Sequence, residues 1–172
     1  MAASLAEGNF ISFEQRFEHA LNNEKYSDFY WMEIALNEAR LSGEDVPVGC
    51  VLVRDNELIA KGNNQKEKTQ DPTDHAEIVA IRRACSMQKS WRLDGTTLYT
   101  TLEPCPICAE TIMQARVSRL VFGAYDENSG AVGSKFNLFV PGRPYPVPAV
   151  TGGIMKEECQ KLLQDFFRQR RK

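Results

Sequence analysis

Four residues near the middle of the chain have the types and spacing of a catalytic metal site. His75 and Glu77 lie two residues apart, and Cys105 and Cys108 follow within a Pro-Cys-Pro-Ile-Cys sequence. Zinc prefers histidine nitrogen and cysteine thiolate as ligands, and a catalytic zinc has three protein ligands and a fourth position for water. We therefore predict that His75, Cys105 and Cys108 bind Zn²⁺.

Glu77 is the expected proton carrier of this site. Residues two positions apart on a helix point in different directions, so Glu77 is not expected to be a ligand beside His75. Zinc lowers the pKa of bound water to about 7, which makes that water a nucleophile at neutral pH. We expect Glu77 to take a proton from water that attacks an amine-bearing ring carbon. It would then protonate the ring nitrogen and the departing ammonia, which is hydrolytic deamination.

The Cys-x-x-Cys segment by itself has other interpretations. It occurs in thioredoxin-like redox sites, but such a site would leave His75 and Glu77 unexplained, and the order of elements differs from that fold. It also occurs in structural zinc sites, where four protein ligands are usual and Glu77 would have to be the fourth. An RNA-binding module with a structural zinc is therefore the non-enzymatic alternative.

The composition is that of a globular protein with one main domain. The chain has 172 residues, of which 42% are hydrophobic and 26% charged, and its net charge is −2. No apolar run reaches the length of a membrane span, and the N-terminal residues lack the pattern of a secretory signal. The odd number of cysteines, five, favours a reducing compartment, so we expect a cytoplasmic protein.

The C-terminal end of the chain is basic. Residues 168–172 contain four basic residues and no acidic one. Bases at the end of a helix interact favourably with the helix dipole, so this segment could be a solvated helix end. The alternative is that it contacts the phosphates of a nucleic acid. The charge pattern alone leaves both alternatives open.

The hydrophobic pattern predicts the elements that would position the four site residues. Residues 1–27 are expected to form an N-terminal extension with a short helix over 12–22. Residues 28–172 would form the domain that carries the candidate zinc-dependent deaminase site. His75 and Glu77 would lie in the first turn of one helix, and the two cysteines at the start of the next. The predicted elements are a helix over 28–41, a strand over 48–53, its hairpin partner over 58–60, a loop over 62–70, a helix over 74–88, a strand over 97–102, a helix over 104–115, a strand over 120–124, a loop with one short helix over 128–148 and a helix over 155–170. This order indicates one sheet covered by helices.

Two segments resemble the cytidine deaminase-like superfamily, TDHAEIVAI over 73–81 and TLEPCPICA over 101–109. The wider match, over 28–172, is to bacterial-type tRNA adenosine deaminases, a known example of this chemistry. Further matching segments are VPVGCVLV, LVFGAYD, GAVGS and DFFR. The resemblance implies a three-layer α-β-α fold, in which helices flank a central mixed sheet of about five strands.

The resemblance also implies a substrate and an assembly. Members of the family convert adenosine 34, the first anticodon nucleotide of an arginine tRNA, to inosine; they act as homodimers and hold the flipped base in a pocket. Seven residues match positions that contact the anticodon stem-loop in the family. They are Asn64 at the base or ribose, Val46 and Leu102 in the pocket wall, Asp126 at a neighbouring ribose, and Phe167, Arg168 and Arg170 on the last helix.

Three features depart from the family pattern. Pro106 and Ile107, between the two cysteines, are more typical of guanine or cytosine deaminases. Glu110 stands where tRNA deaminases have Gly or Ser, and the proline-rich segment 141–148 replaces a His-rich loop. Deamination of a free base or nucleoside, such as guanine or cytosine, is therefore the alternative activity.

Overall fold

The sheet begins with a hairpin. In the computed structural model, which describes residues 26–170, strand β1 (Gly49–Arg54) turns through Asp55 and Asn56 into β2 (Glu57–Asn63). Both turn residues have a positive φ, 52° and 60°, which suits a two-residue hairpin turn. β2 is longer than its predicted length, so the loop expected over 62–70 begins two residues later. That segment also contains a short helix, α3 (Lys66–Thr69).

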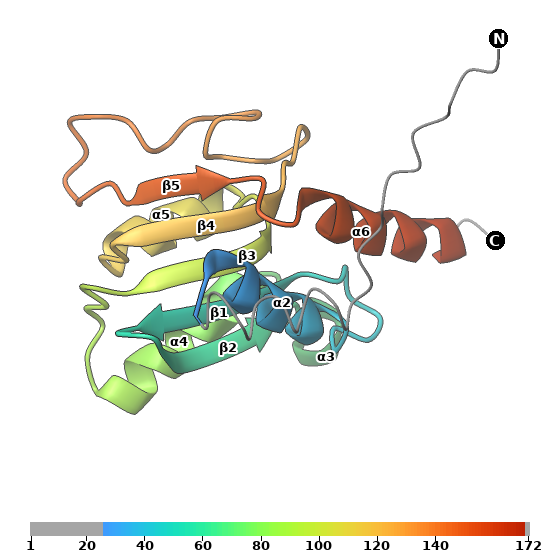
Figure 1. Cartoon of the computed structure of the whole chain (residues 1–172), viewed down its shortest axis with the longest axis horizontal. Helices are drawn as coiled ribbons and strands as arrows, with labels where there is room; N and C mark the ends of the chain where they lie inside the picture. The colour runs from blue at the N-terminus through green and yellow to red at the C-terminus, as the bar shows by residue number, and fades with distance from the viewer. Residues whose placement is uncertain (1–25, 171–172) are drawn as a thin grey trace, which may run out of the picture.

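Three further strands extend the sheet beyond β1. β3 (Thr97–Leu102) pairs antiparallel with β1, and β4 (Arg119–Ala124) and β5 (Ala149–Gly152) continue parallel to β3. The strand order β2-β1-β3-β4-β5 confirms the predicted mixed sheet of five strands (Figure 1). β5 matches no predicted strand, because its four residues are exposed or half-buried and carry no hydrophobic pattern. Residues 128–148 form no helix, so the short helix predicted there is wrong.

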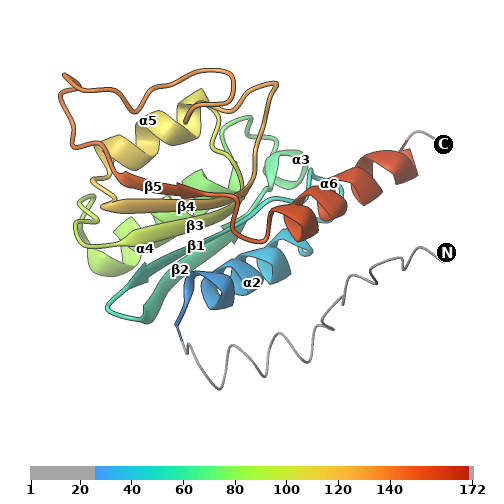
Figure 2. The same cartoon turned by 45° about the horizontal axis from the view of Figure 1, so that its top comes forward.

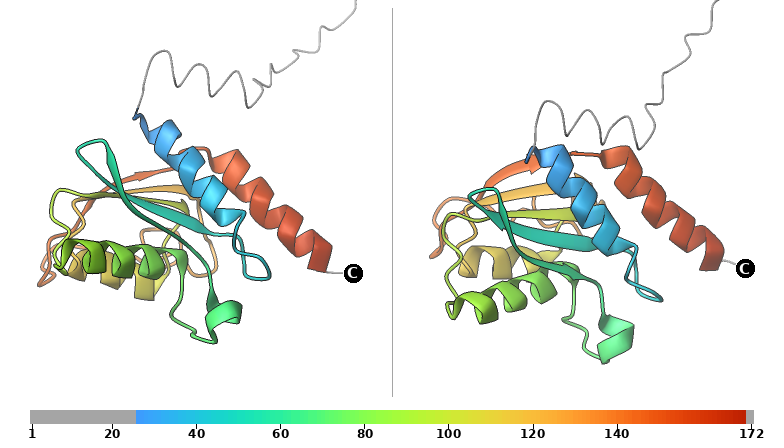
Figure 3. Two further views of the ribbon diagram at one scale, coloured as in Figure 1. Left: turned by 90° about the horizontal axis from the view of Figure 1, so that it is seen from below. Right: turned by 60° about the horizontal axis from the view of Figure 1, so that its bottom comes forward.

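Helices cover both faces of the sheet (Figures 2 and 3). On one face lie α2 (Asp28–Ala39) and α6 (Lys156–Arg170), and on the other α4 (Ala76–Gln88) and α5 (Pro106–Gln114). Because side chains alternate along a strand, β1 contributes Cys50 and Leu52 to the core under α4 and α5. Its Val51 and Val53 enter the core under α2 and α6. The predicted three-layer α-β-α arrangement is confirmed.

The two helices of the candidate site begin later than the sequence predicts. α4 begins at residue 76 rather than 74, and α5 at residue 106 rather than 104. His75 and Cys105 are therefore N-cap residues with extended backbone, and the predicted place of His75 in a first turn is wrong. Glu77 does lie in the first turn of α4. Hydrophobic periodicity does not separate a cap from a first turn, because helix ends are ambiguous by one or two residues.

The start of α4 packs closely against β2 at Gly62. A Cβ added to Gly62 would lie 2.6 Å from the carbonyl oxygen of Ala76 and 2.7 Å from the backbone nitrogen of Ala80. A residue with a side chain would push the helix away from the strand, so glycine is required at this contact. The first turn of α4, which carries Glu77, is thereby held against the sheet.

The remaining predictions concern the chain ends. Ser27 caps α2, and its Oγ accepts a hydrogen bond of 3.2 Å from the backbone N–H of Tyr30. α2 ends at Ala39 rather than at residue 41. The helix expected over 12–22 and the last two residues of the basic end lie outside the described residues. No helix formed by residues 26–170 has both the length and the apolar character needed to span a membrane.

Candidate metal centre

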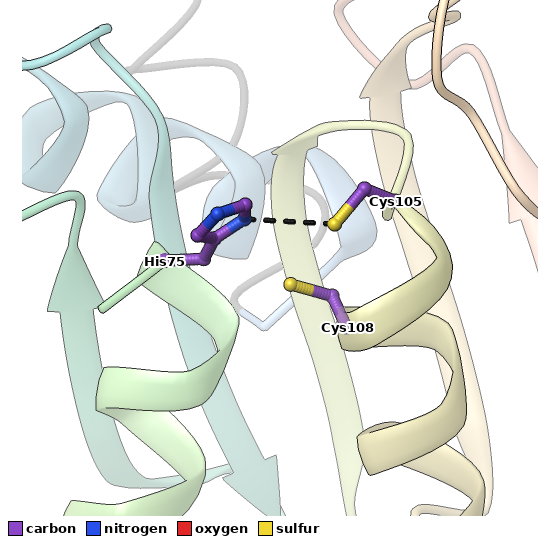
Figure 4. A group of neighbouring side chains, drawn as sticks. All are labelled: His75, Cys105 and Cys108. Carbon is purple, nitrogen blue, oxygen red and sulfur yellow. Dashed lines mark hydrogen bonds between the residues drawn. The ribbon is translucent and has the colours of Figure 1, made fainter. Parts of the chain in front are cut away.

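The starts of two neighbouring helices bring the three predicted ligands together (Figure 4). His75 is the N-cap of α4, Cys105 is the N-cap of α5, and Cys108 lies in the first turn of α5. Their ligand atoms all lie within 4.8 Å of one another, and Cys105 Sγ is 3.6 Å from His75 Nδ1. In a tetrahedral zinc site, the usual bond lengths separate a sulfur and a nitrogen ligand by about 3.5 Å. The donor types and their spacing therefore fit Zn²⁺.

Contacts within this trio shift the ionisation of its members. The Cys108 thiol and then the His75 ring lower the pKa of Cys105 to about 4. The neighbouring Cys105 sulfur and burial raise the pKa of Cys108 well above its usual range. A metal ion deprotonates a coordinating thiol, and both helix N-termini favour negative charge at the sulfur atoms. The trio is thus a set of groups that a divalent cation would stabilise.

Glu77 is buried beside the three predicted ligands and contacts one of them, Cys108. The residue is 4% exposed, its Oε2 accepts a hydrogen bond of 3.4 Å from the Cys108 thiol, and its Oε1 accepts one of 3.4 Å from the Thr100 hydroxyl. Burial raises the pKa of its carboxyl group. Among the described residues, the group of mutually close ligand atoms contains His75, Cys105 and Cys108 but not Glu77. This arrangement favours three ligands with an acid beside them over a four-ligand structural site.

Asn64 connects the start of α4 to the segment before β1. Its Oδ1 accepts a hydrogen bond from the backbone N–H of Ala76 at 2.9 Å, and its Nδ2 donates one to the carbonyl oxygen of Val46 at 2.9 Å. The side chain thus satisfies one of the N–H groups left free at the start of a helix. The predicted contact of Asn64 with a base or ribose stays a prediction.

A pocket of 1110 Å³ opens between α6 and the segment that follows β4. Four of the residues predicted to contact substrate line it. They are Val46, Leu102, Asp126 and Phe167. The metal ligands and Glu77 do not line this pocket, and Leu102, three residues before Cys105, is the lining residue closest to them in the chain. Two basic residues that the sequence analysis did not single out, Lys135 and Lys156, also line it.

Comparison with known proteins agrees with this geometry. The family described as "Cytidine and deoxycytidylate deaminase zinc-binding region" matches residues 25–124, which include the trio and Glu77. The tRNA-specific adenosine deaminase of Bacillus subtilis is 42% identical over 147 residues, covering 84% of this chain and 91% of the relative. That of Agrobacterium fabrum is 44% identical, covering 83% of this chain and 95% of the relative.

The chain belongs to the tRNA-specific adenosine deaminase family. A chloroplastic tRNA(adenine(34)) deaminase of Arabidopsis thaliana is 44% identical over 161 residues, which are 83% of this chain but 12% of that relative. Among solved structures, one from a study of A-to-I editing by tRNA:A34 deaminases has a TM-score of 0.72 and 42% identity, covering 78% of this chain and 99% of that one. A protein solved with 8-azaguanine has a TM-score of 0.69 at 20% identity, and so shares the fold.

In this member of the tRNA-specific adenosine deaminase family, the Asp126 carboxylate is engaged by its own loop. It accepts hydrogen bonds from the backbone N–H groups of Asn128 at 2.9 Å and Ser129 at 3.1 Å, and from the Ser129 hydroxyl. These bonds hold the side chain at the pocket in one orientation. Its predicted contact with a ribose stays a prediction.

The two predicted arginines of this deaminase lie on α6 outside the pocket lining. Arg170 donates a hydrogen bond to the carbonyl oxygen of Glu44, and its guanidinium carbon lies 4.4 Å from the ring centroid of Phe166. Arg168 lies 3.6 Å from the Asp165 carboxylate, with most of its side chain exposed. Arg170 thus ties the end of α6 to the segment before β1, while Arg168 faces solvent.

Two parts of the chain that differ from the tRNA deaminase pattern, segment 141–148 and Glu110, contact each other. Arg143, in the proline-rich segment 141–148, donates a hydrogen bond to the carboxylate of Glu110 on α5. Pro106 occupies the first turn of the same helix, where a missing N–H group has no cost. Glu110 and Arg143 therefore have complementary charges. Their ion pair holds the proline-rich segment 141–148 against α5, the helix that carries Cys108.

Proposed function

We propose that the protein is a zinc-dependent enzyme that deaminates adenosine to inosine at the wobble position, position 34, of tRNA. The proposal rests on the proximity of four side chains, those of His75, Cys105, Cys108 and Glu77. The chain that brings them together is 42% identical to a tRNA-specific adenosine deaminase. The net reaction consumes one water and releases one ammonia for each adenosine.

Each site residue has one role in this proposal. His75, Cys105 and Cys108 hold Zn²⁺, which when bound lowers the pKa of water to about 7. Glu77 takes one proton from the attacking water and delivers it to the ring nitrogen. It then takes the second proton from the new hydroxyl group on the ring carbon and delivers it to the amine, which leaves as ammonia while the C=O bond forms. The burial of Glu77 keeps bulk water from competing for these protons.

The pocket supplies the contacts for an RNA loop. Val46 and Leu102 offer apolar surface, Phe167 offers an aromatic ring on which a base can stack, and stacking of this kind contributes about 1 to 3 kcal/mol per base. Lys135 and Lys156 are exposed at the pocket, and the Lys156 ammonium lies 5.5 Å from the Tyr125 ring centroid, so both charges can interact with phosphates there. Asn64 and Asp126 would contact the base and a ribose, and Arg168 and Arg170 the backbone further along the RNA.

The same resemblance extends the proposal to an arginine tRNA as substrate, to a homodimer as the active form and to the cytoplasm as the place of action. All five cysteines are free thiols, which accords with a reducing compartment. Light scattering of the full chain measures its oligomeric state. Anticodon stem-loops of an arginine tRNA and of other tRNAs, each carrying adenosine 34, measure tRNA preference.

The central experiment compares an RNA substrate with free bases. Zinc-loaded protein is incubated with an anticodon stem-loop carrying adenosine 34, and separately with guanine, cytosine and adenine. We expect ammonia and inosine from the stem-loop only. A stem-loop with guanosine at position 34 is the matched control and should release no ammonia. Ammonia from the free bases alone would reject the proposal and favour the alternative activity.

A further inference from the structure

A buried carboxylate outside the metal centre lies between the metal-binding segment and the pocket. Glu103 follows β3 and precedes Cys105 by two residues, and it is 2% exposed. Leu102, directly before it, lines the pocket. Glu103 therefore stands where the two parts of the candidate active site meet, although it belongs to neither the ligand set nor the pocket lining.

The Glu103 carboxylate accepts four hydrogen bonds from a single segment of chain, residues 126–134. The backbone N–H groups of Asp126, Val132 and Ser134 each lie 3.1 Å from one of its oxygens. The Ser134 hydroxyl donates the fourth bond. A carboxylate only accepts hydrogen bonds, so it matches four donors, whereas a glutamine would point an NH₂ group at some of them.

Backbone contacts on both sides of Glu103 strengthen the same connection. Its own N–H group donates to the carbonyl oxygen of Ala124 at 2.8 Å, and the N–H group of Ala131 donates to the carbonyl oxygen of Pro104 at 2.8 Å. A Cβ added to Gly130 would lie 2.5 Å from the carboxyl carbon of Glu103, so only glycine lets the loop close around this side chain.

The segment that Glu103 holds is a wall of the pocket. Asp126, Ser129, Ser134 and the following Lys135 all line the pocket. The residues on the other side of Glu103, Pro104 to Cys108, carry two of the three metal ligands. One buried side chain thus sets the position of the pocket wall relative to the metal centre.

We propose that Glu103 is a positioning residue for the RNA substrate, which holds the wall formed by residues 126–135 in register with the metal-binding start of α5. The identity of the substrate in this inference rests on the proposed function, whereas the link between Glu103 and the wall does not. The pocket wall contacts the substrate and not the reacting atoms, so a displaced wall should weaken substrate binding more than it slows the chemical step.

The test compares Glu103→Gln with the parent in the full, zinc-loaded chain. We expect faster hydrogen exchange at the backbone amides of Asp126, Val132 and Ser134, because they lose their acceptor. We expect an unchanged zinc content and a KM for the stem-loop raised by about tenfold, with a smaller change in kcat. Ser134→Ala removes one donor and leaves the carboxylate, so it should give a weaker version of both effects even where Glu103→Gln folds poorly.

Glu57→Gln is the matched control, because Glu57 is an exposed acid on β2, far along the chain from the pocket wall. It should change neither exchange at the three amides nor KM. Unchanged exchange and KM in Glu103→Gln would overturn the inference, and so would loss of zinc with the three amides still protected. If the parent does not deaminate the stem-loop, the proposed function fails, and the exchange data still decide whether Glu103 holds the wall.

Discussion

Two of the three proposed ligand residues are helix caps that make no capping hydrogen bond. The side chains of His75 and Cys105 leave the first N–H groups of α4 and α5 to other partners and point toward each other. At α4, one of these N–H groups is satisfied by Asn64. The positive ends of two helices therefore face the same point, where they favour the thiolates that zinc binding requires.

Removal of the Glu77 carboxylate should separate proton transfer from metal binding. In Glu77→Gln we expect kcat for the stem-loop to fall by at least about a hundredfold, because the amide cannot take a proton from water. Zinc content should stay that of the parent, since the three ligand residues are untouched. Ammonia release and metal analysis on the same preparation measure both quantities, with Glu57→Gln as the control. Retained activity, or a loss of zinc, would contradict the assigned role.

At the scale of elements, one carboxylate connects α2 to the far half of the sheet. Asp28, in the first turn of α2, accepts two hydrogen bonds of 2.7 Å from the Arg119 guanidinium on β4 and one of 2.9 Å from the Tyr99 hydroxyl on β3. Arg119 also donates to the Thr151 hydroxyl on β5 at 3.0 Å. This network supports the short strand β5, which has few buried side chains of its own.

Asp28→Asn should lower the free energy of unfolding by about 1 to 2 kcal/mol at neutral pH, because the charge that pairs with Arg119 is lost. Arg119 and then Tyr99 hold the pKa of Asp28 below its ordinary value. The ionised carboxylate therefore stabilises the fold at every pH above the ordinary aspartate pKa of about 4, and this contribution disappears as pH falls through the lowered value. Urea unfolding across this pH range should show parent and variant converging in acid.

Asp94→Asn is the control for this measurement, since the Asp94 side chain is exposed and forms no ion pair or hydrogen bond with another residue of 26–170. Its unfolding curve should follow that of the parent at every pH. A constant difference between the parent and Asp28→Asn down to the most acidic conditions would show that the ionised carboxylate is not the source of the stabilisation.

Some elements follow from local sequence and others do not. The hairpin turn at Asp55 and Asn56 and the cap at Ser27 were predictable, because each depends on residues within a few positions. β5 was not predictable, because its place is set by pairing with β4 and by the Arg119 network rather than by its own side chains. The close packing of α4 against β2 at Gly62 likewise depends on two elements and not on a local pattern.

At the scale of the whole molecule, the pocket is assembled from distant parts of the chain. Val46 precedes β1, Leu102 ends β3, Lys135 follows β4, and Lys156 and Phe167 lie on α6. The chain has a net charge of −2, so its affinity for RNA must come from local concentration of positive charge. Two lysines and two acids, Asp126 and Glu127, line the pocket, and the Asp126 carboxylate already accepts three bonds from its own loop, so the two lysines are the groups there that can pair with phosphates.

Replacing both lysines by glutamine should weaken binding of the stem-loop and make it less dependent on salt. Each phosphate contact to single-stranded RNA contributes about 0.7 to the slope of log K against log salt, so the double variant should lose about 1.4. Binding is measured in a Glu77→Gln background, which prevents turnover. Lys89→Gln is the control, because Lys89 caps the far end of α4, about 20 Å from the site. An unchanged slope in the double variant would remove the lysines from the RNA contact surface.

By itself, the sequence pointed to the proposed metal ligands and the acid beside them, and its resemblance to the deaminase family predicted the three-layer fold. Metal binding needs rare residue types at short spacings, such as Cys105 and Cys108 on one helix turn, and buried strands and helices have recognisable periods. Only the tertiary structure decided that Glu103 joins the metal-binding segment to the pocket wall, that Arg143 pairs with Glu110, and that two lysines border the pocket. Each of these arrangements brings together residues more than twenty positions apart in the chain. A local pattern of side chains therefore cannot predict it.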